Sequence, residues 1–179
     1  FALDANRADS AFVTRVPAGA YTIHLASADN SGGAGLVEVY DVDGDDSAAL
    51  INLSTRAEVS PGADVLIPGF VVTGTGAQMY MIRAIGPSLE SFNVANPLPD
   101  PQLTLYRDGV IITLNDNWSD AGNADQTAAL AANIGAFALP VGSADAAVSL
   151  ALSPGSYTVH VSGAEGTAGS VLVEIYAVE

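Results

Sequence analysis

Short apolar stretches broken by Gly, Pro, Asn and Asp recur along the whole chain. Alternation of apolar and polar residues predicts strands with one buried face, and the residues between the stretches predict turns. An Asp108-Gly109 pair indicates a tight connection between two of the strands. We predict one short helix, over residues 124–133, and strands over residues 65–73, 78–85, 102–106 and 110–114.

An internal repeat organises the chain. Residues 1–43 align without a gap onto residues 137–179, an offset of 136 positions, and 17 of the 43 pairs are identical. Residues 48–136 occur once. The sequence therefore predicts the C-terminal part of one repeat over residues 1–46, ending in a polar linker at 41–46, and a complete repeat over residues 47–179.

The repeated segment itself predicts two strands joined by a turn. In the first copy the strands are residues 20–25 and 36–40, and in the second copy they are residues 157–161 and 171–176. We interpret each pair of strands as a hairpin. Each copy holds a histidine and a glutamate 14 positions apart, and we expect these to be structural cross-strand pairs rather than catalytic groups. They are His24 with Glu38, and His160 with Glu174.

Several short strands and at most one helix predict an all-β fold. We expect residues 47–179 to form an antiparallel β-sandwich of the jelly-roll type, accompanied by the half-repeat of residues 1–46. Although 49% of the residues are hydrophobic, no apolar run approaches the ~20 residues that cross a bilayer. Membrane insertion is therefore not expected.

The charge is strongly negative, with 20 acidic residues, 5 arginines, no lysine and a net charge of −15. Such a chain repels nucleic acid phosphates and favours divalent cations as partners, although charge that only maintains solubility is the alternative. Without cysteine, disulfides and thiolate metal sites are excluded. Without lysine, isopeptide crosslinks are excluded, so any assembly is expected to be non-covalent. The composition suits a bacterial exported protein.

Two sets of motifs resemble known families. The first set is residues 50–56, 69–74, 83–89, 100–101, 115–118 and 172–176, and the second set is residues 103–106, 115–117 and 152–159. By the first set the chain resembles a tandem repeat of roughly 130 residues in large secreted or surface proteins of environmental bacteria, to which no catalytic activity is assigned. By the second set it is also similar to the pre-peptidase C-terminal type of bacterial β-sandwich, which implies a non-catalytic appendage and, in some members, calcium binding.

A candidate calcium site follows the last of the strands predicted before the helix. Ca²⁺ takes about six to eight oxygen ligands, partly from backbone carbonyls. The alternative is a turn whose Asn and Asp side chains bond their own backbone. The acidic residues 41–46 are a second candidate calcium loop, and a solvated linker is the alternative for them. The candidate ligands of the first site are Asn115, Asp116, Asn117, Asp120 and Asp125.

Two further residues invite a structural or a ligand-binding interpretation. Arg83 lies in an otherwise apolar predicted strand, and we expect it to be buried and paired with a carboxylate. A ligand contact is the alternative. Trp118 is the only tryptophan, and we expect it to fill the core, whereas an exposed ring could stack on a sugar.

Together the sequence favours a non-catalytic extracellular or cell-surface protein, a filament or array subunit with copies of itself as partners. Residues 1–46 lack the neighbouring strands that the complete repeat has. Their apolar residues are therefore expected to be buried by pairing with strands of another subunit, which is strand complementation. The alternative is a calcium- or carbohydrate-binding accessory module of a larger secreted protein. No enzymatic activity is expected, and no cofactor other than calcium. The predicted assembly residues are Tyr21, Ile23, Leu25, Leu36, Val37 and Val39.

Overall fold

The computed structural model describes residues 9–29, 31–42, 49–62, 65–120 and 122–178. The chain divides into two compact units, Phe1–Leu50 and Ile51–Glu179. This division falls close to the boundary predicted between residues 46 and 47. No helix in the described residues is long and apolar enough to cross a membrane.

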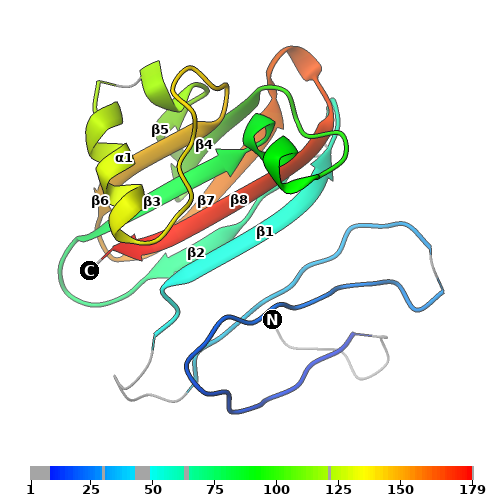
Figure 1. Ribbon diagram of the computed structural model, residues 1–179. Helices are drawn as coiled ribbons and strands as arrows, with labels where there is room; N and C mark the ends of the chain where they lie inside the picture. Colours follow the sequence, from blue (N-terminus) through cyan, green and yellow to red (C-terminus); the bar gives the residue numbers. More distant parts are fainter. Residues whose placement is uncertain (1–8, 30, 43–48, 63–64, 121, 179) are drawn as a thin grey trace. The chain divides into compact units, whose positions relative to one another are not determined.

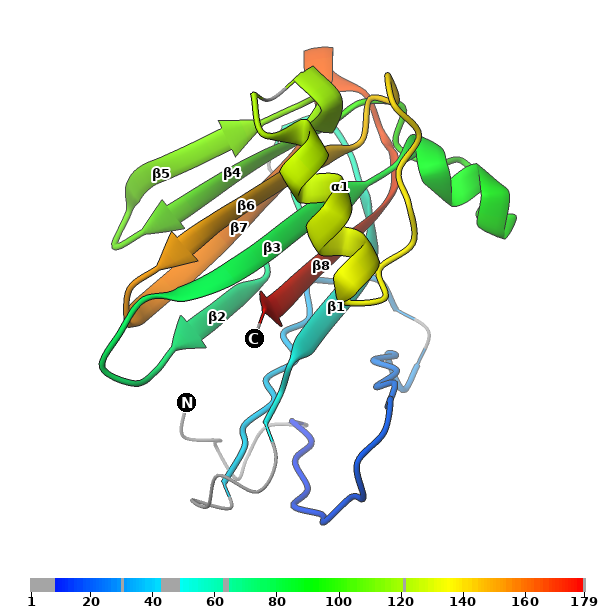
Figure 2. The same ribbon diagram turned by 60° about the vertical axis from the view of Figure 1, so that its left-hand side comes forward.

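The unit Ile51–Glu179 consists of two four-stranded antiparallel sheets packed face to face (Figures 1 and 2). Sheet A has the strand order β1-β8-β3-β6, and sheet B has the order β2-β7-β4-β5. The predicted antiparallel β-sandwich is therefore confirmed. The strands are β1 (Asn52–Val59), β2 (Gly69–Val72), β3 (Gln78–Ile85), β4 (Pro101–Arg107), β5 (Val110–Asn115), β6 (Ala146–Leu152), β7 (Gly155–Gly163) and β8 (Gly169–Val178).

The strands pair in a nested order. β1 pairs with β8, β2 with β7, β3 with β6 and β4 with β5. The additional pairs β3–β8 and β4–β7 complete the two sheets. This arrangement is the jelly roll, in which one long antiparallel ribbon of strands is rolled up into a sandwich.

The nested order contradicts the predicted hairpin between residues 157–161 and 171–176. β7 and β8 belong to different sheets, and the short 3-10 helix η3 (Ala164–Gly166) carries the chain from one sheet to the other. The predicted cross-strand pair of His160 and Glu174 is therefore also wrong. His160 stands opposite Thr104 on β4, and Glu174 stands opposite Arg83 on β3. Alternation identifies the buried face of a strand, but it does not identify the neighbouring strand.

The main core lies between the two sheets. Alternate residues of the strands point into this core. Buried side chains of β7 reach it from sheet B, and those of β8 reach it from sheet A. The ring of Phe70 lies 5.3 Å from that of Tyr80 and 5.4 Å from that of Tyr157, measured between centroids. The residues buried in this core include Ile82, Leu103, Leu105, Val159, Val161, Val171, Val173 and Ile175.

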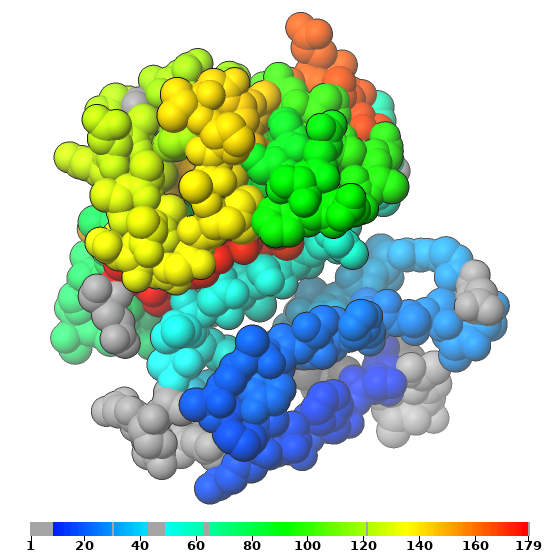
Figure 3. All heavy atoms as spheres, viewed as in Figure 1, coloured from blue at the N-terminus to red at the C-terminus, as the bar shows by residue number. Residues whose placement is uncertain are grey.

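The outer face of sheet A is also covered. Helix α1 (Ala124–Asn133) and the loop after it lie over β3, where Met81 packs against Ala131 and Ala136 (Figure 2). The 3-10 helix η1 (Pro87–Phe92) covers the other end of this face, and only a narrow strip of β8 is seen between these segments and β1 (Figure 3). Burial on both faces explains the continuous apolar run of β3.

The bounds of β3 and α1 agree with the sequence-based prediction, whereas β4 is longer than predicted by one residue at each end and β5 by one residue at its C-terminal end. The strand predicted over residues 65–73 is shorter. Only Gly69–Val72 forms β2, and Leu66 makes an isolated bridge to Val161. Between them Pro68 has no N–H to donate to a neighbouring strand. β1 and β6 were not predicted.

The unit Phe1–Leu50 has a different character. Its described residues, 9–29, 31–42 and 49–50, contain no strand or helix, so the strands predicted over residues 20–25 and 36–40 are not formed there. A local turn is present, in which the Ser27 hydroxyl and the Ser31 N–H donate to the carboxylate of Asp29. These hydrogen bonds lower the pKa of Asp29, with that from Ser27 as the largest cause.

Candidate functional site

The last three strands of the sandwich take all their strand partners from residues that precede them. β6 pairs with β3, β7 pairs with β2 and β4, and β8 pairs with β1 and β3. None of the three pairs with another of the three. We call the surface between residues 51–136 and residues 137–179 the closing interface.

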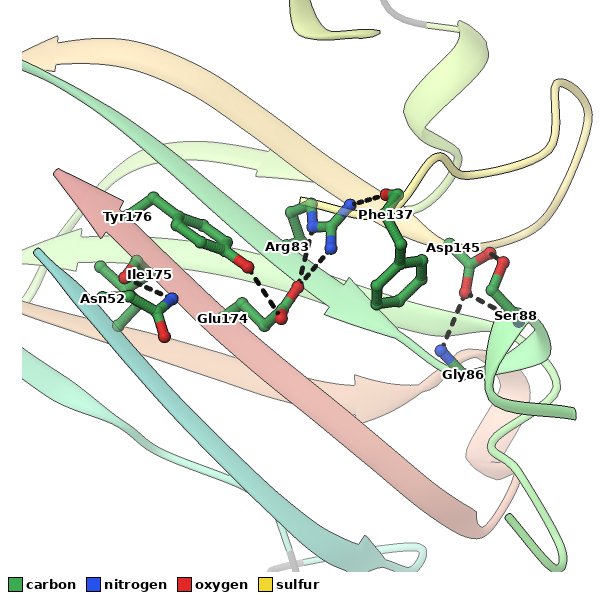
Figure 4. A network of polar contacts seen from close by, with 9 residues as sticks. All are labelled: Asn52, Arg83, Gly86, Ser88, Phe137, Asp145, Glu174, Ile175 and Tyr176. Carbon is green, nitrogen blue, oxygen red and sulfur yellow. Dashed lines mark hydrogen bonds and ion pairs between the residues drawn. The ribbon is translucent and has the colours of Figure 1, made fainter. Parts of the chain in front are cut away.

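A buried ion pair lies at the centre of the closing interface (Figure 4). Arg83 on β3 is 1% exposed, and its Nε donates to Oε2 of Glu174 at 2.9 Å. Its Nη2 donates to the same oxygen, and its Nη1 donates to the carbonyl oxygen of Phe137 at 2.6 Å. The prediction of a buried arginine paired with a carboxylate is therefore confirmed.

Two aromatic rings enclose this ion pair. The Cζ atom of Arg83 lies 4.5 Å from the ring centroid of Phe137 and 5.9 Å from that of Tyr176. The hydroxyl of Tyr176 donates to the second oxygen of Glu174 at 2.9 Å. Burial, followed by the negative charge of Glu174, raises the pKa of Tyr176 to about 12. The charges are thus shielded from water and partnered on both sides.

A buried carboxylate forms a second connection across the closing interface (Figure 4). Asp145, just before β6, is 0% exposed. Its Oδ1 accepts hydrogen bonds from the N–H groups of Gly86 at 2.9 Å and Ser88 at 3.3 Å. Its Oδ2 accepts from the hydroxyls of Ser88 and Ser143. Asp145 therefore fixes the start of η1 to the start of β6.

The side chains that make these connections are the same in both copies of the repeat. The residues of 137–179 that form the two connections described above are Phe137, Asp145, Glu174 and Tyr176. Their counterparts, 136 positions earlier, are Phe1, Asp9, Glu38 and Tyr40. Phe1 lies outside the described residues.

Two local hydrogen bonds also recur at the same offset. In each copy a tyrosine hydroxyl donates to a backbone carbonyl four residues earlier, and a second tyrosine donates to a glutamate two residues earlier. The bonds are Tyr157 to Ser153 at 2.7 Å and Tyr21 to Pro17 at 2.7 Å, then Tyr176 to Glu174 at 2.9 Å and Tyr40 to Glu38 at 3.0 Å. The first copy therefore has the local hydrogen bonds of the second copy without its strands.

The two copies differ sharply in burial. All six predicted assembly residues are exposed, whereas their counterparts in the sandwich lie in β7 and β8. Five of the pairs show the contrast clearly: Tyr21 59% and Tyr157 3%, Ile23 51% and Val159 0%, Leu25 62% and Val161 0%, Val37 46% and Val173 1%, Val39 45% and Ile175 4%. The sixth, Leu36, is 70% exposed.

The candidate calcium ligands lie near the end of β5. Asn115 has a structural role there, because its side chain donates to the carbonyl of Asn117 at 3.1 Å and accepts from the N–H of Ala147 at 2.9 Å. Asp116, Asp120 and Asp125 are exposed, and Asn117 is half-buried. Within the described residues, no three His, Cys, Asp or Glu side chains are grouped as ligands for a metal. This calcium site stays a prediction, and most of the loop 41–46 lies outside the described residues.

A neighbouring carboxylate was missed by the sequence analysis. Oδ1 of Asp100 is buried and has no hydrogen-bond partner in the described part of the chain. Burial raises the pKa of Asp100, and the charges of Asp116 and Glu165 raise it further. The negative charges of Asp116 and Glu165 therefore act on Asp100, although the described residues hold no group of three such side chains that could ligate a metal ion.

Trp118 fills the core, as predicted. It is 5% exposed, and its Nε1 donates to the carbonyl of Pro140 at 3.0 Å and to the hydroxyl of Ser143 at 3.3 Å. A pocket of about 90 Å³ beside Trp118 and Arg83, under α1, is small beside the several hundred Å³ of typical ligand pockets. The buried ring is thus not available to stack on a sugar at the surface.

No family model matches the sequence, and no curated protein sequence matches it. A solved structure with a similar arrangement is the pre-peptidase C-terminal domain of a collagenase from Bacillus anthracis. The similarity covers 70% of this chain and 89% of that domain, with a TM-score of 0.41 and 11% sequence identity. At this level of similarity we draw no functional conclusion from it.

Asp145 and Phe137 were also missed by the sequence analysis, although a signal for both was present. A lone acidic residue within an apolar stretch, identical at the same place in both copies, indicates a buried carboxylate with fixed partners. Asp145 and Asp9 meet that description, and Phe137 is likewise matched by Phe1. The identities within the repeat thus mark the closing interface better than any single motif does.

Proposed function

We propose that the protein is a non-catalytic structural protein of the bacterial cell surface, a filament or array subunit that assembles non-covalently. Residues 9–42 act as a strand donor, which adds three strands to a sandwich unit with the same kind of closing interface. The observation that carries this proposal is the contrast in burial between the two copies of one repeated segment.

The free energy for such assembly comes from apolar burial. Fully burying a large aliphatic or aromatic side chain contributes about 1.5–3 kcal/mol. The six assembly residues would together contribute on the order of 10 kcal/mol, before the cost of ordering the segment is subtracted. Strand donation also supplies backbone hydrogen bonds to the added strands. Because the donor and the acceptor are different surfaces, repeated contacts of this kind build an open filament unless they close into a ring.

The proposal is tested by removing the donor. We expect the full chain to gain mass with concentration in light scattering, and a chain without residues 1–46 to remain a monomer. The deleted chain keeps the complete sandwich, which has its own core. A full chain that stays monomeric at high concentration would contradict the proposal, and so would a deleted chain that assembles equally well.

A pair of matched variants separates apolar burial from a general effect of the segment. Replacing Tyr21, Ile23 and Leu25 with serine should abolish assembly. Replacing Ala20 and Thr22 with serine should leave it unchanged, because their counterparts Ser156 and Thr158 are exposed. Equal effects of the two variants would count against donation of this strand.

A second candidate function is calcium binding by the sandwich as an accessory module. It is favoured by the buried, unpartnered oxygen of Asp100 beside Asp116 and Glu165. Hard oxygen ligands of this kind suit Ca²⁺. Carbohydrate binding also stays a prediction, and the burial of Trp118 removes the residue that was expected to carry it.

A further inference from the structure

We infer that the specific partner of residues 9–42 is an unfilled unit of the same repeat, consisting of β1 to β5, whose β3 carries a buried arginine that pairs with Glu38. This inference rests on the strand donation in the proposed function, rather than on self-assembly of the full chain, and names the acceptor.

Strand pairing defines what the acceptor must contain. By the ungapped alignment, residues 10–16, 19–27 and 33–42 correspond to β6, β7 and β8. In the sandwich these strands pair only with β1, β2, β3 and β4, and never with one another. The donor therefore cannot build a sheet alone, which explains why its described residues contain no strand. Its apolar residues are buried only by a unit that supplies those four strands.

Charge defines which residue the acceptor must carry. Glu38 occupies the place of Glu174, and it already accepts the hydrogen bond from Tyr40 that Glu174 accepts from Tyr176. In the closing interface that glutamate is 8% exposed and paired with Arg83. A carboxylate buried without a partner is strongly unfavourable. A unit with an arginine at this position is therefore favoured over one without it.

Two further identities fit the same acceptor. Asp9 occupies the place of Asp145, whose carboxylate receives the N–H groups at the start of η1. Gly33 occupies the place of Gly169, where a Cβ atom would lie 2.7 Å from the backbone nitrogen of Leu98. A side chain at this position would therefore prevent the close approach of the two backbones. Both residues are retained in the donor.

A sandwich that is already filled is a poor acceptor. In this chain β1 to β5 are filled by residues 137–179, which act at a high effective concentration because they belong to the same chain. A donor from elsewhere would have to displace them. A unit that lacks its own closing segment therefore accepts residues 9–42 more readily than a complete sandwich does.

The test adds an unfilled unit to the full chain. Residues 47–136 are placed a second time ahead of Phe1, so that Ala136 is followed by Phe1 as it is normally followed by Phe137. Amide hydrogen exchange is then measured in residues 19–27 and 33–42. We expect exchange there to slow by at least about 100-fold relative to the unextended chain and to approach that of residues 155–163 and 169–178.

Matched variants test the arginine. Changing Arg83→Leu in the added unit alone should speed exchange of residues 33–42 about 10-fold or more, and Glu38→Leu in the same chain should restore protection. Changing the exposed Arg56→Leu in the added unit is the control, and it should have no such effect. The restored protection in the double variant also shows that the added unit folds.

The outcomes separate this inference from the proposed function. Unchanged exchange in residues 19–27 and 33–42 of the extended chain would overturn the inference, even if the unextended chain assembles in light scattering. An effect of Arg83→Leu no greater than that of Arg56→Leu would overturn the arginine pairing. Strong protection in the extended chain supports the inference, even if the unextended chain is a monomer and the proposed self-assembly fails.

Discussion

Arg83 and Glu174 stand directly opposite each other on neighbouring strands, with the ring of Phe137 over the guanidinium group. The pair holds β8 to β3 in one register, because a shift of one residue would turn Glu174 away from its partner. Arg83 belongs to residues 51–136, whereas the residues that contact it here, Phe137, Glu174 and Tyr176, all belong to residues 137–179. The positive charge at the centre of the sandwich therefore comes from residues 51–136, and the negative charge that balances it comes from residues 137–179.

The first prediction concerns this ion pair. Arg83→Met should lower the free energy of unfolding by about 3–5 kcal/mol, because Glu174 remains buried without a partner. The double variant with Glu174→Leu should recover most of that loss, since an apolar pair is tolerated at such positions. Urea denaturation of the three proteins measures both effects. A single variant as stable as the double would show that the carboxylate is relieved in some other way.

The second prediction concerns Asp145. Asp145→Ala should lower the free energy of unfolding by about 3 kcal/mol, because the N–H groups of Gly86 and Ser88 lose their acceptor. Glu90→Ala is the control, since Glu90 is an exposed acidic residue of η1. Thermal unfolding followed by the fluorescence of Trp118 compares the two. Similar losses for both variants would reject a special role of the buried carboxylate.

The third prediction follows from the pKa of Tyr176, which is raised from 10.0 to about 12. The native protein binds this proton more tightly than the unfolded chain does, so its contribution to stability is complete below pH 10 and is lost as the pH rises toward 12. Tyr176→Phe should therefore make the loss of stability over this interval less steep. Urea midpoints measured across the interval provide the comparison. Equal steepness in the two proteins would contradict the raised pKa.

The fourth prediction concerns Asp100 in calcium-free buffer. Its pKa is raised, so the native protein binds a proton there more tightly than the unfolded chain, and this residue's contribution to stability falls as the pH rises above the usual carboxyl range. Asp100→Asn should therefore raise the melting temperature at neutral pH. The difference from wild type should shrink as the pH is lowered. A variant that melts lower at neutral pH would show that the charged form is stabilised.

The fifth prediction tests the calcium site. If Asp116 and its neighbours hold Ca²⁺, a chelator should lower the melting temperature of calcium-loaded protein by several degrees, because a ligand that binds only the folded state stabilises it. Asp116→Ala should abolish this difference, whereas Asp108→Ala, an exposed acid on the β4–β5 turn, should keep it. Identical melting curves with and without chelator would reject the site.

The sequence determined local features well. The continuous apolar run of β3 and the Ala- and Leu-rich residues of α1 predicted both elements with their observed bounds, because both depend on local composition. The burial of Arg83 was also predicted from its apolar strand, and that of Trp118 from the size and apolar character of the only tryptophan. Such features depend on residues close in the sequence, where period and polarity are informative.

Features that depend on distant pairing were not predicted correctly. Glu174 was assigned to His160 because 14 positions suit a hairpin, but its partner Arg83 lies 91 positions away. The short apolar stretch of β6 carried no clear period, and the start of β1 is exposed, so neither strand was identified. The role of Asp145 depends on N–H groups 57 and 59 positions away. No local pattern specifies these contacts.

The nested pairing also sets the order in which the sandwich is able to fold. Asn52, at the start of β1, pairs with Tyr176, near the end of β8, so the two edges of one ladder are synthesised far apart in time. Contacts between such distant residues make folding slow. Until β8 emerges from the ribosome, β1 has no neighbour and β3 lacks one of its two. A growing chain of this kind exposes open strand edges throughout most of its synthesis, and repeats made one after another would each pass through the same vulnerable stage.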